Sequence, residues 1–356
     1  MLYFVFLSSL TLALWNVQLV ITQDIPLADK QIPYDQIPEK VDTDDGPRGI
    51  QIGYNRCNST TEGQSSLCQT AYVNSLDDFC IWGPREPNST IAEEEGALVA
   101  WCTQPGRGTR IIPPNTLQGI QFMRTPDYLQ ITGRIDQSLI NIASNDTGGE
   151  EDPHGADGRG NPLGSLVYSN GFASNNGNTN NFQQVIEWHN FLGGNIFCFK
   201  ICDPAGANAV NFCQHIYDRI GCAYNAPAAY RLGVFEKCLG DNQDFPGVYT
   251  GPDGQVSTYF QPPESLGPIT SIPYQPRIPA SSQCVQFQSE VLYSSADNFF
   301  PKPTSTSTSS TATATTSVAN PIAIPTSLVN GCTSPAYSLQ MFFIIFAIVS
   351  GAFLAM

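Results

Sequence analysis

Basic residues are scarce in this chain of 356 residues. There are 16 lysines and arginines against 31 aspartates and glutamates, which gives a formal net charge of −15 at pH 7. Nucleic acids and anionic membrane surfaces both attract proteins through basic patches, so we expect neither as a partner. Charged residues of either sign make up only 13% of the chain, and the polarity of its surface therefore has to come from uncharged side chains.

The sequence also lacks the motifs that mark common catalytic sites. It contains no G-x-S-x-G, no H-E-x-x-H, no P-loop and no G-x-G-x-x-G between a strand and a helix. A pair of carboxylates that hydrolyses a glycosidic bond has no such motif, because its defining feature is a distance in space. No catalytic residue and no cofactor are predicted, but a carbohydrate-active hydrolase stays open as the alternative to a non-enzymatic protein.

No C-x-x-C pair occurs among the 11 cysteines, and exported thiols are normally oxidised, so a metal site is not predicted. Cys332 lies in a C-terminal segment that we expect to be removed, which leaves ten cysteines. They form a group of four and a group of six, so five disulfides without a bridge between the groups are expected, with the pairing inside each group open. The ten are Cys57, Cys68, Cys80, Cys102, Cys198, Cys202, Cys213, Cys222, Cys238 and Cys284.

Both ends of the chain carry apolar segments. Residues 1–22 are typical of a secretory signal peptide, and the short residues around Asn330, the polar spacer after them and the 16 apolar residues 341–356 are typical of a GPI-attachment signal. We therefore predict lipid attachment at Asn330, removal of residues 331–356, and a protein held at the cell surface, plasma membrane or cell wall. The lipid is then its one contact with the membrane.

Two further segments have the composition of unpacked chain. Residues 23–48 are acidic and dotted with proline, and we interpret them as an extended, exposed leader. Residues 304–317 hold 12 serines or threonines in 14 positions, which is typical of an O-glycosylated, disordered stalk over residues 301–330.

Residues 49–300 remain for the folded part, and their pattern is that of β-structure. Alternating or continuous apolar runs predict strands at residues 97–102, 117–123, 128–135, 164–168, 182–191 and 195–201, with an edge strand after Cys284. A helical period occurs only at residues 209–220, where we predict one short helix. The fold class is mainly β, a disulfide-stapled β-sandwich or barrel-like structure, as one domain or as two modules of about residues 49–145 and 165–300.

Three N-glycosylation sequons lie in turn-like, polar stretches. They are Asn58-Ser-Thr, Asn88-Ser-Thr and Asn145-Asp-Thr, none with proline in the middle. We expect a glycan on each asparagine.

Residues 148–164, called the 148–164 loop below, are the densest polar stretch of the chain. Six glycines and two prolines alternate there with carboxylates, one imidazole and one guanidinium. One interpretation is a ligand-binding or catalytic loop that uses Asp152, His154, Asp157 and Arg159, with the carboxylates of residues 150–157 as the groups of a hydrolase. The other is a long structural loop held by side-chain turns and an arginine–carboxylate pair. The remaining histidines, His189 and His215, lie too far along the sequence to define a metal site. Glu187 and His189 share one face of the predicted strand, where we expect a partly buried His189 that is hydrogen-bonded to a neighbour.

Several short motifs resemble the fungal macrophage-activating glycoprotein family. They are Cys80-Ile-Trp-Gly-Pro, Val99-Ala-Trp-Cys102, Thr125-Pro-Asp-Tyr128, Asp152-Pro-His-Gly-Ala-Asp157, Gly160-Asn-Pro-Leu-Gly164 and Phe197-Cys-Phe-Lys-Ile-Cys-Asp-Pro204. The resemblance covers most of residues 57–284 and implies a secreted or GPI-anchored fungal cell-surface glycoprotein. It transfers no catalytic residue. The expected role is structural or glycan-binding, with cell-wall polysaccharide or host surface glycans as partners.

Overall fold

A computed structural model describes residues 25–293, 295–296 and 299–300. The predicted signal peptide, stalk and GPI segment, with Asn330, lie outside these residues. In the described part, no helix reaches the length and apolar character that crossing a bilayer requires.

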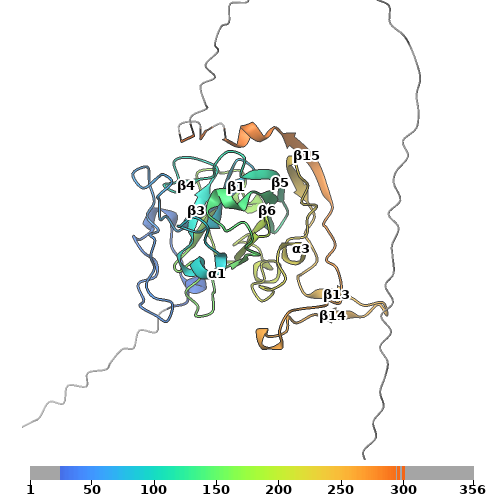
Figure 1. Cartoon of the computed structure of the whole chain (residues 1–356). Coiled ribbons are helices and arrows are strands. Elements are labelled where there is room, and N and C mark those ends of the chain that lie inside the picture. The colour runs from blue at the N-terminus through green and yellow to red at the C-terminus, as the bar shows by residue number, and fades with distance from the viewer. Residues whose placement is uncertain (1–24, 294, 297–298, 301–356) are drawn as a thin grey trace, which may run out of the picture. The chain divides into compact units, whose positions relative to one another are not determined.

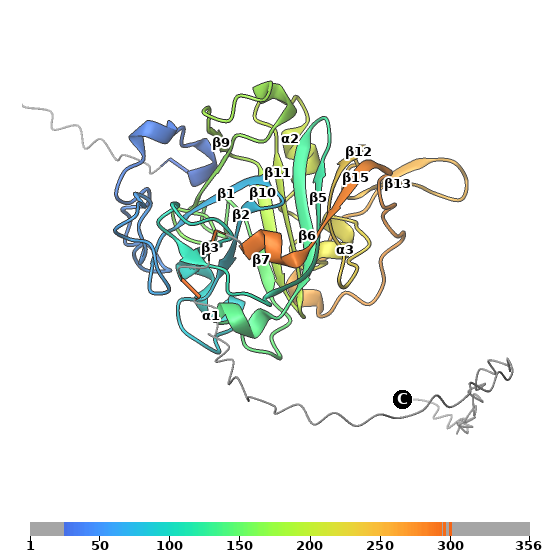
Figure 2. The ribbon, with the colours of Figure 1, turned by 90° about the horizontal axis from the view of Figure 1, so that it is seen from above.

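Most strands of the described chain belong to two β-sheets (Figure 2). The first has six strands in the order β4-β3-β2-β1-β8-β9 and contains both parallel and antiparallel pairs. Its strands are β1 Thr70–Ser75, β2 Asp78–Gly83, β3 Val99–Cys102, β4 Arg110–Ile111, β8 Leu166–Ser169 and β9 Gln183–Val185.

The second sheet has seven strands in the order β15-β12-β5-β6-β11-β10-β7, and only the β12–β5 pair is parallel. A separate two-stranded hairpin, β13 Val248–Thr250 and β14 Val256–Thr258, projects beside it (Figure 1). The sheet comprises β5 Leu117–Arg124, β6 Tyr128–Ile135, β7 Gly149–Glu151, β10 Trp188–Gly193, β11 Ile196–Cys202, β12 Phe235–Gly240 and β15 Ser281–Phe287.

The two sheets pack against each other over one hydrophobic core. Phe79 of the first sheet stacks on Phe197 of the second at a ring-centroid distance of 6.1 Å, and Trp82 meets Trp188 at the same distance. The Trp82 backbone N–H also donates across the sheets to Oδ1 of Asn190 at 3.1 Å. The mainly β, sandwich-like fold predicted from the sequence is therefore confirmed.

Strand alternation gives the second sheet two different faces. On β11, Phe197, Phe199 and Ile201 point into the shared core, while Cys198 and Cys202 belong to small clusters on the opposite side. Residues 203–234, together with residues 241–243 after β12, cover that outer side. This cover includes the one-turn helices α2 Ala209–Phe212 and α3 Cys222–Asn225; α1 Ile91–Glu94 lies elsewhere, before β3.

The predicted helix over residues 209–220 is wrong in length. It begins at Ala209 as expected but ends at Phe212. Cys213, the next residue, is bonded to Cys202 of β11, and this link holds the chain against the sheet.

The predicted exposed leader is also wrong within the described residues, because residues 25–48 fold onto the first sheet. Leu27 and Val41 are buried, and Tyr34 stacks on Phe182 at 4.6 Å. The Val41 N–H donates to Asn55 Oδ1 at 2.9 Å. In Figures 1 and 2 this blue segment lies on the side of the domain opposite the orange strand β15.

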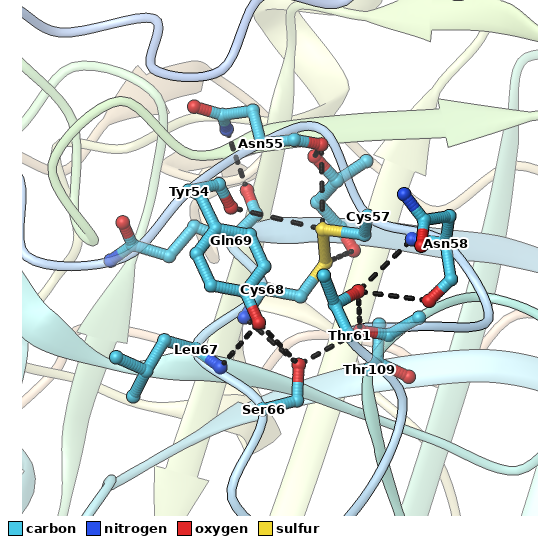
Figure 3. Close-up of a disulfide and its surroundings, with 12 residues drawn as sticks. Tyr54, Asn55, Cys57, Asn58, Thr61, Ser66, Leu67, Cys68, Gln69 and Thr109 are labelled. Atoms are coloured by element: carbon cyan, nitrogen blue, oxygen red, sulfur yellow. Dashed lines mark hydrogen bonds between the residues drawn. A yellow bond between two sulfur atoms is a disulfide. The ribbon is translucent and has the colours of Figure 1, made fainter.

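All ten cysteines pair as five disulfides, and no bridge joins the two groups that the sequence defines. Figure 3 shows Cys57–Cys68 with the sequon residue Asn58 directly beside it. Two bridges attach the cover to β11, and one ties β15 to β12. The five bonds are Cys57–Cys68, Cys80–Cys102, Cys198–Cys222, Cys202–Cys213 and Cys238–Cys284.

Candidate functional site

The 148–164 loop starts on β7, the edge strand of the second sheet. β7 pairs with β10, with Glu150 opposite Phe191 and Glu151 opposite Asn190. Glu150 therefore points to the outer face of the sheet, towards the cover, and Glu151 points to the core side. Strand pairing thus places two adjacent glutamates on opposite faces of the sheet at its edge strand β7.

Asp152 shapes the turn that follows β7. Its Oδ1 accepts hydrogen bonds from the backbone N–H groups of His154 (2.7 Å) and Gly155 (2.9 Å). Its backbone pairs with that of Asn161, which closes the loop upon itself. The Asp152 side chain thus has a structural role, and it also borders the hollow described below.

Asp157 and Arg159 point away from that hollow, towards residues 42–49. Asp157 accepts from Arg48 Nε at 3.1 Å. Arg159 holds Asp42 through Nε at 2.9 Å and through Nη2 at 2.7 Å, and it donates to the carbonyl of Gly49. These two residues of the predicted site therefore fasten the N-terminal segment to the loop.

His154 lies between two partners from distant parts of the chain. Its ring stacks on that of His215 with centroids 3.7 Å apart, and its Nε2 lies 3.8 Å from Glu187 Oε2. The Glu187 carboxylate raises the pKa of His154 against the opposing effect of burial. Burial, and then the neighbouring His154, lowers the pKa of His215. The stack therefore accepts one proton more readily than two.

A hollow of about 370 Å³, the central hollow, opens beside β7. Four carboxyl side chains from three separate segments border it, together with His215. They are Glu95, Glu150, Asp152 and Asp218.

Two of these carboxyls are strongly affected by burial. Glu150 is 6% exposed, and neither of its oxygens has a hydrogen-bond partner among the described residues. Burial raises its pKa well above the ordinary value, and the nearby Asp152 and Asp218 add to the effect. Burial also raises the pKa of Glu95.

Two further hollows adjoin the central one through shared residues. A hollow of about 310 Å³ beside α1, the α1 hollow, shares Glu95 with it. A hollow of about 590 Å³ beside α3, the α3 hollow, shares Gly149 and Asp218. The α3 hollow extends to Arg134 and Tyr230. We call the three together the groove.

Beneath the cover, the outer face of the second sheet is polar. His189 is 0% exposed, and neither ring nitrogen has a hydrogen-bond partner among the described residues. It lies opposite Lys200 on β11, whose Nζ donates to Asn225 and Gln243 of the cover. Burial lowers the pKa of both side chains. The sequence-based expectation that His189 is hydrogen-bonded to a neighbour is therefore wrong.

Among the described residues, one group of side chains has potential metal-ligand atoms close enough together to hold an ion. Glu236, Cys238 and Cys284 place a ligand atom each within 4.8 Å of one another. Both cysteines belong to the same disulfide, so neither offers a thiolate. The carboxyls of the central hollow do not form a compact group of this kind.

The three sequon asparagines, Asn58, Asn88 and Asn145, are all exposed. Oδ1 of Asn58 accepts from Thr60 Oγ1 at 2.6 Å, which leaves its amide nitrogen available. Asn145 is two residues from Thr147, which lines the α3 hollow, so a glycan there would flank that end of the groove. Glycosylation itself stays a prediction.

The sequence analysis named Asp152 and His154 as candidate site residues but missed Glu95 and Asp218. Glu95 follows α1 in an ordinary acidic turn, and Asp218 lies in the cover. Neither belongs to a local motif, so only the fold brings them to β7. The one available signal was the pair Glu187 and His189 on a common strand face, which proved to border the histidine stack.

Five disulfides in one chain are typical of exported proteins, so the fold and groove define a disulfide-rich extracellular β protein. The chain is 46% identical over 234 residues to appressorium protein ROW1 of Mycosarcoma maydis, covering 66% of this chain and 51% of ROW1. It is 41% identical over 229 residues to appressorium protein ROW2 of the same fungus, covering 63% of this chain and 73% of ROW2.

The chain belongs to the family of these fungal appressorium proteins. It spans about half the length of ROW1. No family model matches the chain, and no solved structure matches it.

Proposed function

We propose that the protein is a fungal cell-surface glycoprotein that binds polysaccharide or glycans in the groove. An exported, glycosylated protein agrees with the five disulfides and the three exposed sequons. The relatives are named appressorium proteins, which supports a role at the surface of such a structure. Membership of the macrophage-activating glycoprotein family, implied by the sequence motifs, is part of the same proposal.

The observation that carries glycan binding is the groove itself. Each of the two outer hollows shares at least one lining residue with the central hollow, and carboxyl, amide and imidazole groups border the central one. Such groups accept and donate hydrogen bonds to sugar hydroxyls. The 148–164 loop and the cover form opposite walls, and disulfides fix the cover to β11, so the groove is largely pre-formed.

Replacing His215 with alanine is expected to weaken glycan binding about tenfold, the order of effect of losing one well-placed polar contact. The control is Glu264→Gln, which changes an exposed glutamate that lines none of the three hollows. It should leave binding unchanged and cost at most about 1 kcal/mol of stability. Glycan arrays followed by titration calorimetry measure binding, and thermal melts measure stability. Equal binding by the His215 variant and the unmodified protein would remove the groove from the proposal.

A carbohydrate-active hydrolase is the second candidate, favoured by one observation. Glu95 and Glu150 have raised pKa values and border the same hollow as Asp152 and Asp218. A protonated carboxyl beside an ionised one is the arrangement that glycoside hydrolysis uses. Release of reducing sugars from wall polysaccharides, lost in Glu95→Gln and Glu150→Gln, would establish this activity and displace the non-enzymatic proposal. Our proposal expects no release.

Attachment through a GPI lipid at Asn330 is a further part of the proposal, supported by the sequence of residues 330–356. Phosphatidylinositol-specific phospholipase C is expected to release the native protein from fungal membranes. Immunoblots of membrane and soluble fractions measure the release. Retention of the protein, together with recovery of peptides from residues 341–356, is the contrary result.

A further inference from the structure

We propose that the central hollow recognises a cationic, amine-bearing polysaccharide, that is, a polymer of glucosamine. The inference rests on the proposed glycan-binding function and names the class of glycan. It follows from the carboxyl groups of the central hollow, which lack a lysine or arginine as ion-pair partner among the described residues, and from the arginines of the groove, which have one or more partners already.

The carboxyls of the central hollow have no cationic partner among the described residues. Glu95 accepts from the Asn161 amide at 2.9 Å, Asp218 accepts from the Gln261 amide, and Asp152 accepts from backbone N–H groups. None of them forms an ion pair with a lysine or arginine. No described lysine or arginine therefore neutralises these carboxyls by direct contact; Arg48 acts on Glu95 from a distance, and His215 is the protonatable side chain that lines the hollow with them.

Glu150 adds an independent observation, because it has no partner of any kind among the described residues. It borders the central hollow, is 6% exposed, and has two carboxylate oxygens that make no hydrogen bond. A buried carboxylate in this condition is costly unless a cation or donor is supplied. A protonated amine entering the hollow would supply both.

The arginines bordering the groove are already engaged. Arg48 holds Asp157, Arg134 donates to the Tyr230 carbonyl, and Arg219 donates to two carbonyls of the chain after β14. Their guanidinium groups thus have protein partners, whereas no described lysine or arginine forms an ion pair with a carboxyl of the central hollow. This asymmetry favours a positively charged ligand over an acidic polysaccharide.

A repeating cation fits this hollow better than a single metal ion does. The carboxyls come from three segments and do not approach one another as closely as the ligands of one ion must. A glucosamine polymer instead carries one amine per sugar, so successive amines can meet separate carboxylates. N-acetylation removes that charge while leaving the sugar ring unchanged, which provides a matched control ligand.

The test is calorimetric titration of the mature full-length protein, treated with a chelator, in mildly acidic buffer. The probes are the hexasaccharides of glucosamine, of N-acetylglucosamine and of β-1,3-linked glucose. The glucosamine hexasaccharide is expected to bind at least roughly tenfold more tightly than the other two, the order of one or two charge-assisted contacts. Added salt should weaken this binding, because ion pairs at an open groove are screened.

Two variants locate the effect. Glu150→Gln and Asp218→Asn are each expected to lower the affinity for the glucosamine hexasaccharide roughly tenfold and to leave the affinity for N-acetylglucosamine unchanged. Glu264→Gln, an exposed glutamate in the turn of residues 264–266 away from the groove, is the control and should change neither. Asp218 is exposed, so its variant keeps the test valid if Glu150→Gln fails to fold.

Three outcomes would overturn the inference. Equal affinity for the three hexasaccharides would mean that the groove binds glycans without using its charge, and the proposed function would stand alone. Tight binding of calcium by the chelator-treated protein, abolished in Asp218→Asn, would assign the carboxyls to a metal. Absence of binding to any glycan would remove both this inference and the proposed function.

Discussion

The Glu151→Gln variant is expected to become progressively more stable than the unmodified protein as the pH rises above about 4.5. Glu151 is 0% exposed, and neither carboxylate oxygen has a partner among the described residues. Burial raises its pKa well above the ordinary value of 4.5, Glu95 and Asp152 raise it further, and Arg48 opposes them. The folded state therefore keeps a proton that the unfolded state has released.

The sign follows from this difference in bound protons. Where the folded state binds more protons, the free energy of unfolding falls as the pH rises, by up to about 1.4 kcal/mol per pH unit for one group. The loss starts near the unfolded pKa and ends at the raised folded pKa. Glutamine has no proton to hold, so the stability difference between variant and unmodified protein grows across the same window.

Urea denaturation of both proteins at several pH values measures this difference. The contributions of other buried groups, such as His189 and Lys200, are common to both proteins and cancel in the comparison. Glu264→Gln, which changes an exposed glutamate, should give a difference that does not vary with pH. A flat difference for Glu151→Gln as well would mean that the Glu151 carboxyl finds a donor in solution.

Replacing Asp42 with alanine is expected to cost about 3 to 5 kcal/mol of stability, because it removes the buried carboxylate partner of Arg159 and leaves only the more exposed Asp157 carboxylate, 3.8 Å away. The two side chains are 4% and 10% exposed, and Arg159 holds Asp42 through two nitrogens. Asp157→Asn, which affects the more exposed pair with Arg48, should cost about 1 kcal/mol or less.

The double variant Asp42→Ala, Arg159→Met tests whether the stability lost in Asp42→Ala is due to the charge that is left on Arg159. It removes the isolated charge, so it should recover much of the stability that Asp42→Ala loses. Chemical denaturation of the single and double variants measures the coupling. If the double variant is no more stable than Asp42→Ala, then Arg159 is stabilised by its carbonyl partners, Asp44 and Gly49, rather than by the carboxylate.

Strands with a local signal were predictable from the sequence. β6 was predicted with its observed bounds and β5 to within one residue, because an apolar alternation lies on each side of the Thr125-Pro-Asp turn. β12 was missed, since it is set by parallel pairing with β5 more than a hundred residues earlier. A pairing of that kind leaves no signal in the sequence next to β12 itself.

The N-terminal segment shows a second limit of prediction from the sequence, because a segment predicted to be exposed and unpacked is ordered in the structure. Its composition resembles unpacked chain because it buries few large side chains, chiefly Leu27 and Val41. Its order comes from polar contacts with distant residues, such as the Ile32 N–H on Gln184 Oε1. The candidate site could likewise be predicted only in part. Asp152 and His154 lie in a conspicuous polar loop, whereas Glu95 and Asp218 are brought to the site only by the fold.

Strand β15 has a mechanical consequence for a protein held from its C-terminal side. It is the edge strand of the second sheet, and the Cys238–Cys284 bond joins it to β12, which lies one strand further in. Tension applied beyond residue 300 would first break the contact between the Tyr293 hydroxyl and the Leu117 N–H, then peel β15 from its C-terminal end. Peeling stops at Cys284, where the load passes through a covalent bond into the interior of the sheet. Tension on a protein attached through its C-terminal side, as proposed, would thus separate residues 285–293 from the sheet while leaving the groove intact.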